Sequence, residues 1–242
     1  MSCVAGHQPN LYPYAGFFAK TAAVDKFVIV DNTQYVKKEY HNRNRVILRN
    51  GDVIWLSIPV KNAGRYKQQI NEAVIDGTAW KRVHERTLAL NYKPAPWFDW
   101  LFADLVELWK RDWRMLADYN LSVIKLCLGK LGVDTPLYLA SELEISGAST
   151  ELIANICDAS KCDTYLHGAH ARDYVDFNLL ETRGIKSLIQ DYQAVEYPQT
   201  APGFTPNLSI LDIIFNNGPK SLDVILEGQK ISPLGDPKRQ IR

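Results

Sequence analysis

Four apolar residues in a row, Phe27 to Val30, stand directly before Asp31. A run that is apolar at every position is typical of a strand buried on both faces, as in a parallel sheet. A second short strand is predicted at Val4–His7. The Asn50-Gly51 turn lies between two apolar stretches, 45–48 and 53–58, and this pattern is a strong indication of a β-hairpin.

Strand and helix patterns alternate along the rest of the chain, which predicts an α/β fold with a partly parallel, mixed sheet. We expect further strands at 69–75, 137–140, 164–166 and 185–189, and helices at 16–23, 79–90, 98–109, 113–131, 150–159 (capped by Ser149) and 210–216 (capped by Ser209). The helical middle segment spans about 79–132. We expect one domain over 1–230 and a C-terminal surface tail over 231–242.

Composition excludes several classes of partner. The chain has 28 Lys+Arg against 27 Asp+Glu, a net charge of +1, which predicts no nucleic-acid partner. No apolar run reaches the length of about 18 residues that spans a bilayer, so we expect no membrane insertion. The N-terminus does not resemble a signal peptide, and the four cysteines read as free thiols, so we expect a cytoplasmic location.

The segment Gly6–Tyr14 is the strongest candidate for a site. His7, Gln8 and Asn10 follow the predicted first strand, and Pro9 and Pro13 make the loop rigid. In open α/β sheets, ligands bind beyond the carboxyl ends of strands. The alternative for His7 is a structural hydrogen bond to a neighbouring backbone group.

A second polar region follows the Phe27–Val30 strand. Asp31 could bind a ligand hydroxyl or amine, or else cap a turn. Lys37, Arg43 and Arg45, with Asn44 between the two arginines, could clamp a diphosphate, because guanidinium groups match oxyanions. The alternative is a solvated basic edge strand.

Other candidates are spread along the chain. Trp80 and His84 share one face of a predicted helix, where packing at the edge of the core is the alternative. Gly168 ends the strand that carries Tyr165, and Tyr197 and Gln199 belong to a rigid loop. Cysteine and histidine, the usual zinc ligands, also occur together at Cys157, Cys162, His167 and His170. Their spacing differs from that of zinc ribbons and zinc fingers, so we expect no metal site.

At these residues the sequence resembles the WbqC-like family over essentially the whole chain to about residue 225. The resemblance rests on an ordered series of short motifs: His7-Gln8-Pro9-Asn10, Gly16-Phe17-Phe18, Phe27-Val28-Ile29-Val30-Asp31, Asn42-Arg43-Asn44-Arg45, Trp80, His84, Tyr92, Tyr165-Leu166, Gly168, Tyr197-Pro198-Gln199 and Leu208-Ser209-Ile210-Leu211-Asp212. At His167 the family pattern would have a small residue such as Ser.

The resemblance implies an acyl or aminoacyl (for example glycyl) transferase that acts on the amine of a nucleotide-linked amino sugar or related small amine, in bacterial surface-polysaccharide or secondary-metabolite biosynthesis. It implies no required cofactor, with a phosphopantetheine-bound donor on an acyl or peptidyl carrier protein as one source of the group. Two alternatives stay open: a nucleotide-dependent ligase or nucleotidyltransferase, and a non-catalytic subunit that binds a sugar nucleotide or carrier protein.

For the transferase, chemistry suggests a role for each candidate. His7 or His84 would serve as the base. Gln8, Asn10 or Asn44 would stabilise the oxyanion. Lys37, Arg43 and Arg45 would hold the diphosphate or the phosphopantetheine. Aromatic side chains that could stack on a sugar or base are Tyr12, Trp80 and Tyr165.

Overall fold

A computed structural model describes residues 2–234 of the protein. Its main sheet has six strands in the order β5-β2-β1-β6-β7-β8. Five strands run parallel, and β8 pairs with β7 in the antiparallel direction. The strands are β1 (Cys3–His7), β2 (Lys26–Ile29), β5 (Leu137–Leu139), β6 (Thr164–Gly168), β7 (Lys186–Tyr192) and β8 (Gln229–Pro233). The predicted α/β fold with a mixed sheet is confirmed.

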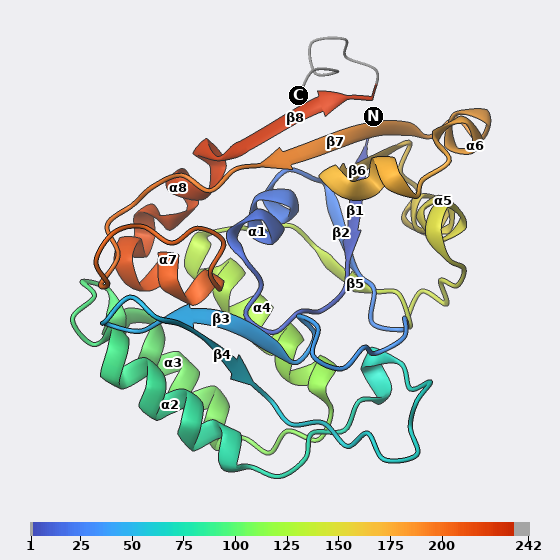
Figure 1. Cartoon of the computed structure of the whole chain (residues 1–242). Helices are drawn as coiled ribbons and strands as arrows, with labels where there is room; N and C mark the ends of the chain where they lie inside the picture. The colour runs from blue at the N-terminus through green and yellow to red at the C-terminus, as the bar shows by residue number, and fades with distance from the viewer. Residues whose placement is uncertain (1, 235–242) are drawn as a thin grey trace.

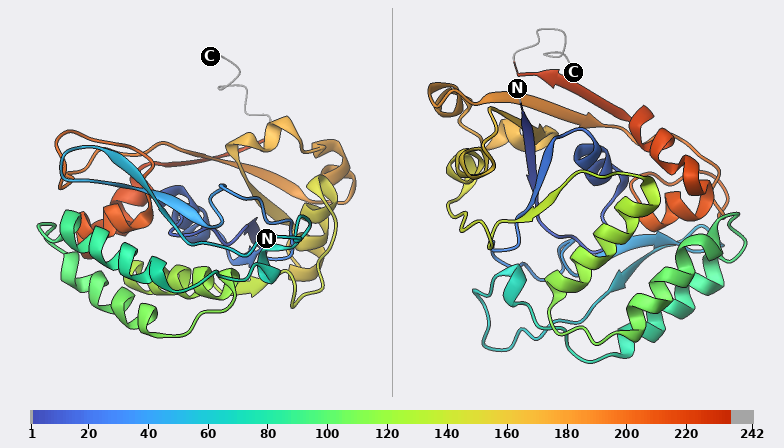
Figure 2. Two further views of the ribbon diagram at one scale, coloured as in Figure 1. Left: turned by 60° about the horizontal axis from the view of Figure 1, so that its bottom comes forward. Right: turned by 180° about the vertical axis from the view of Figure 1, so that it is seen from behind.

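Both faces of this sheet are buried, as the apolar run predicts. Val4 and Val28 belong to the core on one face, whereas Ala5 and Phe27 belong to the core on the other. Figures 1 and 2 show α5 (Ser149–Ser160) and α6 (Phe177–Thr182) on one side of the sheet; α1 (Ala15–Ala22), α7 (Ile210–Asn217) and α8 (Ser221–Glu227) lie on the other. Side chains that alternate along each strand therefore pack against different helices.

The predicted hairpin and helical middle segment are also present. β3 (Arg43–Ile47) and β4 (Val53–Ser57) pair antiparallel around Asn50-Gly51, and Gly51 has a φ of 92°, which favours glycine. Beside them lie α2 (Ala79–Tyr92), α3 (Phe98–Lys110) and α4 (Leu116–Leu131) (Figure 1). α4 begins three residues later than predicted, because Met115 is in an extended bridge with Val74.

Two local predictions are wrong. Residues 69–75 do not form a strand: the Glu72 carboxylate accepts a hydrogen bond from the Gln69 backbone N–H at 2.8 Å and so caps a 3-10 turn, η1 (Ile70–Glu72). Neither predicted serine cap forms a side-chain capping bond. Ser149 lies within α5 and donates to the Tyr174 carbonyl; Ser209 occupies the N-cap position of α7 as predicted, but its hydroxyl has no partner among the described residues.

The end of the chain differs in part from a simple surface tail. Residues 231–233 complete β8, which is an exposed edge strand. Residues 235–242 of the predicted tail lie outside the described residues. No helix in the described part of the chain is long and apolar enough to cross a membrane.

A buried chain of hydrogen bonds joins the first loop to the helical segment. His84 Nε2 lies 3.2 Å from the Ser57 carbonyl oxygen, which only accepts, so this nitrogen carries the proton. Burial lowers the pKa of His84 to about 4, so the ring is neutral and its Nδ1 accepts from the Tyr12 hydroxyl at 3.0 Å. Tyr12 then accepts from Tyr119 at 2.6 Å, and Tyr119 accepts from Trp109 Nε1. Each hydrogen bond in this chain therefore donates in the same direction, from Trp109 through Tyr119, Tyr12 and His84 to the Ser57 carbonyl.

We predict that Tyr12→Phe lowers the free energy of unfolding by about 2 kcal/mol, because the substitution leaves His84 Nδ1 without a donor and the hydroxyl proton of Tyr119 without an acceptor in the core. Urea denaturation would measure the loss. Tyr66→Phe, at a residue that is 85% exposed, is the matched control and should change nothing. Equal stability of the two variants would contradict the structural role given to Tyr12.

Candidate active site at the switch point of the sheet

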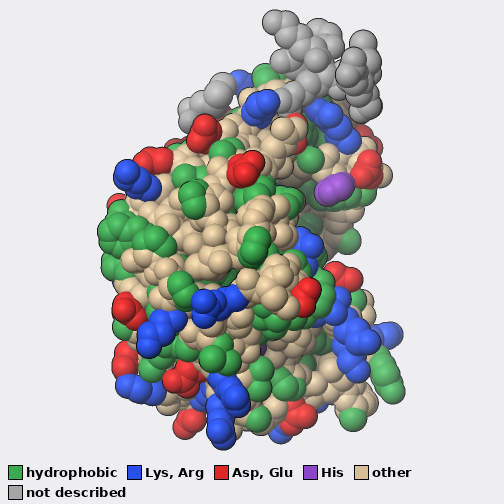
Figure 3. All heavy atoms as spheres, turned by 60° about the vertical axis from the view of Figure 1, so that its left-hand side comes forward, with side chains coloured by type: hydrophobic (Ala, Val, Ile, Leu, Met, Phe, Trp, Pro, Cys, Tyr) green, Lys and Arg blue, Asp and Glu red, His purple; other side chains and the backbone are tan. Residues whose placement is uncertain are grey.

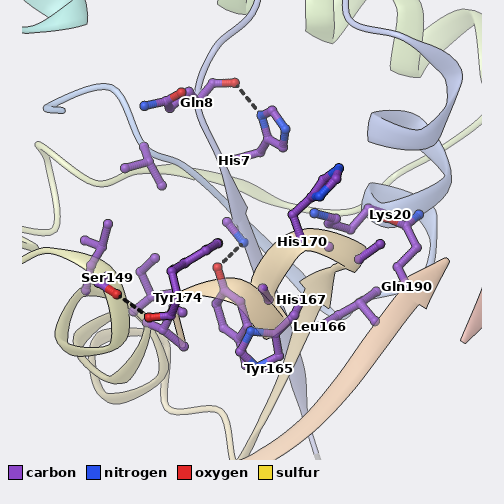
Figure 4. A pocket seen from close by; sticks show the side chains of 18 of the residues that line it. His7, Gln8, Lys20, Ser149, Tyr165, Leu166, His167, His170, Tyr174 and Gln190 are labelled. Atoms are coloured by element: carbon purple, nitrogen blue, oxygen red, sulfur yellow. Dashed lines mark hydrogen bonds between the residues drawn. The ribbon is translucent and has the colours of Figure 1, made fainter. Parts of the chain in front are cut away.

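A cavity of about 500 Å³ lies where the direction of the sheet connections reverses. From β1 the chain adds β2 and β5 on one side, and then β6 and β7 on the other. Adjacent strands whose connections lead away in opposite directions leave a crevice at their carboxyl ends, which is where ligands bind in open α/β sheets. The ends of β1 and β6 line this cavity, together with β7 and the start of α5 (Figure 4).

His7 presents an unprotonated nitrogen at this cavity. Its Nδ1 lies 2.9 Å from the Gln8 carbonyl oxygen, which only accepts hydrogen bonds, so Nδ1 carries the proton and Nε2 has a free lone pair. Burial, and secondarily the charge of Lys20, lowers the pKa of His7 to about 4. His7 therefore bonds a neighbouring backbone group, as the structural alternative expects, and it also lines the cavity.

Gln8 is held by a relay with a defined direction. The Val36 backbone N–H donates to His41 Nδ1 at 3.3 Å, and burial lowers the pKa of His41, so His41 Nε2 carries the proton. It donates to Gln8 Oε1 at 2.9 Å, and Gln8 Nε2 donates to the Thr33 hydroxyl at 2.9 Å. Gln8 and Thr33 both line the cavity, and Thr33 keeps its hydroxyl proton for a ligand.

Lys20 is a cavity residue that the sequence analysis missed. It lies in α1, is only 7% exposed, and forms no hydrogen bond or ion pair with any described residue. A Cβ atom at Gly168 would lie 3.4 Å from Lys20 Nζ, so the amine reaches the end of β6. Burial lowers its pKa to about 8. The sequence signal for its burial was the apolar segment Phe17-Phe18-Ala19 that directly precedes this lysine.

Tyr165 shapes the cavity through its hydroxyl group. The oxygen accepts a hydrogen bond from the Gly6 backbone N–H at 3.1 Å, and the side chain is buried. A Cβ at Gly6 would lie 3.0 Å from this oxygen and 3.0 Å from Ile156 Cδ1, so a larger residue would require these side chains to shift. Tyr165 thus joins β1 to β6, and Gly168 leaves room at the strand end for the Lys20 amine.

The two histidines of the zinc-like pattern have different partners. His167 lies 3.1 Å from the Ser187 hydroxyl and packs against Phe177, and burial lowers its pKa to about 4. His170 is exposed at the rim, in η2 (Ala169–Asp173). Cys157 and Cys162 are buried free thiols. Within residues 2–234, no group of three or more His, Cys, Asp or Glu side chains is placed to hold a metal ion.

Several predicted site residues lie elsewhere. Tyr12, Trp80 and His84 are buried in the helical half, where Trp80 packs edge-on against Tyr119 with ring centroids 4.8 Å apart. The lone pair of His84 is used by Tyr12. Asp31 accepts hydrogen bonds from the backbone and hydroxyl of Ser141, so it ties the end of β2 to the loop after β5.

The predicted diphosphate clamp is not assembled. The Arg43 guanidinium lies 4.0 Å from the Trp55 ring centroid, whereas Arg45 donates to the Asn207 carbonyl at 2.9 Å. Asn44 donates its side-chain amide hydrogens to the backbone carbonyls of Leu11 and Tyr12 in the first loop. Lys37 is exposed, and Asn10 contributes its backbone N–H to the Gln8 carbonyl. None of these residues lines the 500 Å³ cavity. Figure 3 shows basic and acidic side chains interspersed on one face.

Tyr197 and Gln199 form a separate cluster around Asp212. Gln199 Nε2 donates to Asp212 Oδ2 at 3.1 Å, and Gln199 Oε1 accepts from the Thr205 backbone. Asp212 is fully buried, and burial raises its pKa to about 7. The cavity beside Tyr197 measures only about 10 Å³, enough for about one water molecule.

We predict that Asp212→Asn becomes more stabilising as the pH rises. Between about pH 4 and 7 the folded state keeps a proton on Asp212 that the unfolded state releases, so this group's contribution to stability falls through that window. The variant, compared with the wild type by urea denaturation, should gain more than about 1 kcal/mol on going from pH 5 to pH 8. Asp118→Asn, an exposed control on α4, should show no such gain. A constant difference between variant and wild type would contradict the raised pKa.

Comparison with known proteins identifies relatives over nearly the whole chain. The model of the WbqC-like protein family matches residues 8–224. A protein of Mycobacterium tuberculosis, described as uncharacterized, is 35% identical over 230 residues, which cover 93% of this chain and 98% of the relative. No solved structure matches the chain. The matched range includes Gln8, Lys20, Thr33 and Gly168, but begins one residue after His7.

Proposed function

The chain belongs to the WbqC-like protein family, and from that premise we propose that it is a transferase. It transfers an acyl or aminoacyl group, such as glycyl, to the amine of a nucleotide-linked amino sugar or a related small amine. The observation that carries the proposal is the free Nε2 lone pair of His7 at the switch-point cavity. An attacking amine must lose a proton, and a neutral imidazole is the side chain suited to take it.

The reaction balances with this single base. The amine nitrogen attacks the carbonyl carbon of a thioester, and its proton goes to His7 Nε2. The carbon–sulfur bond then breaks, and the leaving thiolate takes the same proton back, which gives an amide and a free thiol. The second N–H of Gln8 and the hydroxyl of Thr33 are the donors available at the cavity for the oxyanion.

The cavity supports a small-molecule acceptor with a tethered donor. Its volume of about 500 Å³ falls within the usual range of ligand sites. We propose phosphopantetheine on an acyl or peptidyl carrier protein as the donor, with surface-polysaccharide or secondary-metabolite biosynthesis as the setting. The free cysteines of this chain fit the reducing cytoplasm.

We predict that His7→Asn lowers kcat at least a hundredfold. Asn keeps a donor for the Gln8 carbonyl but removes the lone pair that accepts the proton. The assay would combine glycyl-pantetheine thioester with UDP-linked amino sugars and detect the glycylated acceptor by mass spectrometry. Glu85→Ala, at an exposed position on α2, is the control and should keep full activity.

The same assay distinguishes the alternatives. Unchanged turnover by His7→Asn would contradict the proposed base. Product that forms only with ATP and Mg²⁺ would favour a ligase, and tight binding of the sugar nucleotide without product from any thioester would favour a binding subunit.

A further inference from the structure

Lys20 is a buried cation without a partner. A side chain that carries a charge and is only 7% exposed is normally paired, because desolvation of an unpaired charge is costly. No carboxylate among the described residues pairs with Nζ, and burial accounts for its lowered pKa. At about 8, that pKa still leaves most of the amine protonated at neutral pH. Asp191 is a carboxylate that also lines the cavity, but its charge is not among the causes that shift the pKa of Lys20, so no carboxylate of the described residues acts as a close counter-charge.

Histidine and tyrosine side chains make up most of the titratable groups that line the cavity with Lys20. Titratable side chains that line the cavity with it are His7 from β1, His167 from β6, His170 from η2, Asp191 and Tyr192 from β7, and Tyr14, Tyr165 and Tyr174. The charge of Lys20 lowers the pKa of both His7 and His167. Two neutral histidines from neighbouring strands thus flank the amine, and Gly168 has no side chain that would block approach to it.

We propose that Lys20 anchors an oxyanion of the ligand, a phosphate or a carboxylate, inside this cavity. An ammonium group binds such anions as a point charge with three donors. In Figure 4, Lys20 lies at the opposite end of the cavity from Ser149 and Tyr174. The rest of a ligand held by Lys20 can therefore extend past His7 toward the start of α5.

Oxyanion binding would also activate His7. The bound anion offsets the charge of Lys20, and that charge is one of the causes that lower the pKa of His7. The pKa of His7 then rises toward the neutral range in which a general base works best. This second step rests on the proposed function, because it concerns His7 as the base; the anchor itself does not.

Calorimetry with inorganic phosphate, pyrophosphate and acetate tests the anchor. We expect wild-type protein to bind at least one of these anions. Binding of phosphate or pyrophosphate would identify a phosphate ligand, and binding of acetate a carboxylate ligand. Lys20→Met should weaken that binding at least tenfold, whereas Lys20→Arg keeps the charge and should retain most of it. Lys125→Met, at an exposed lysine on α4, is the control. Absence of binding by the wild type, or unchanged binding by Lys20→Met, would overturn the proposal.

An NMR titration of the histidine rings gives a second readout in folded wild-type protein. The signal of His7, assigned by its loss in His7→Asn, should titrate at higher pH when the anion is saturating. In Lys20→Met the His7 signal should titrate at a higher pH than in wild type even without anion, and addition of the anion should not change its pKa. A His7 pKa that the anion leaves unchanged would overturn the activation step. Anion binding without acyl transfer would support the anchor and contradict the transferase, so the two failures are distinguishable.

Discussion

A backbone carbonyl oxygen accepts hydrogen bonds and cannot donate them, and this constraint determines the protonation of two histidines. His84 faces the Ser57 carbonyl through Nε2, and His7 faces the Gln8 carbonyl through Nδ1. In His84 the remaining nitrogen accepts from Tyr12, so the ring is fully used within the core. In His7 the remaining nitrogen faces a cavity. The same residue type therefore completes a hydrogen-bond chain in one place and leaves a lone pair at a cavity in the other.

The sequence predicted the features that depend on local pattern. The apolar run at Phe27–Val30, the Asn50-Gly51 hairpin and the loop that carries His7 and Gln8 all depend on neighbours along the chain, and each is present. The strand predicted at 69–75 failed because one carboxylate, Glu72, caps a turn. Alternating apolar residues alone could not reveal that capping bond.

The candidate site was less predictable because its members are engaged by distant residues. Arg43 and Arg45 are near neighbours in sequence, but their guanidinium groups bind Trp55 and the Asn207 carbonyl. Lys20 lies on a helix, where a lone lysine usually faces solvent. Its burial follows from the packing of α1 against the sheet and from the position of Gly168, which is 148 residues later in the chain.

His7, the proposed base, and Lys20 come from one continuous segment, because β1, the first loop and α1 together span residues 3–22. Another part of the lining comes from β6 and η2, which are far away in sequence; η2 carries the exposed His170. His7 and Lys20, to which we assign the chemistry, are thus encoded separately from this second part of the cavity lining. A relative could acquire a new acceptor through substitutions in residues 169–174, while the geometry of His7 and Lys20 stayed as it is.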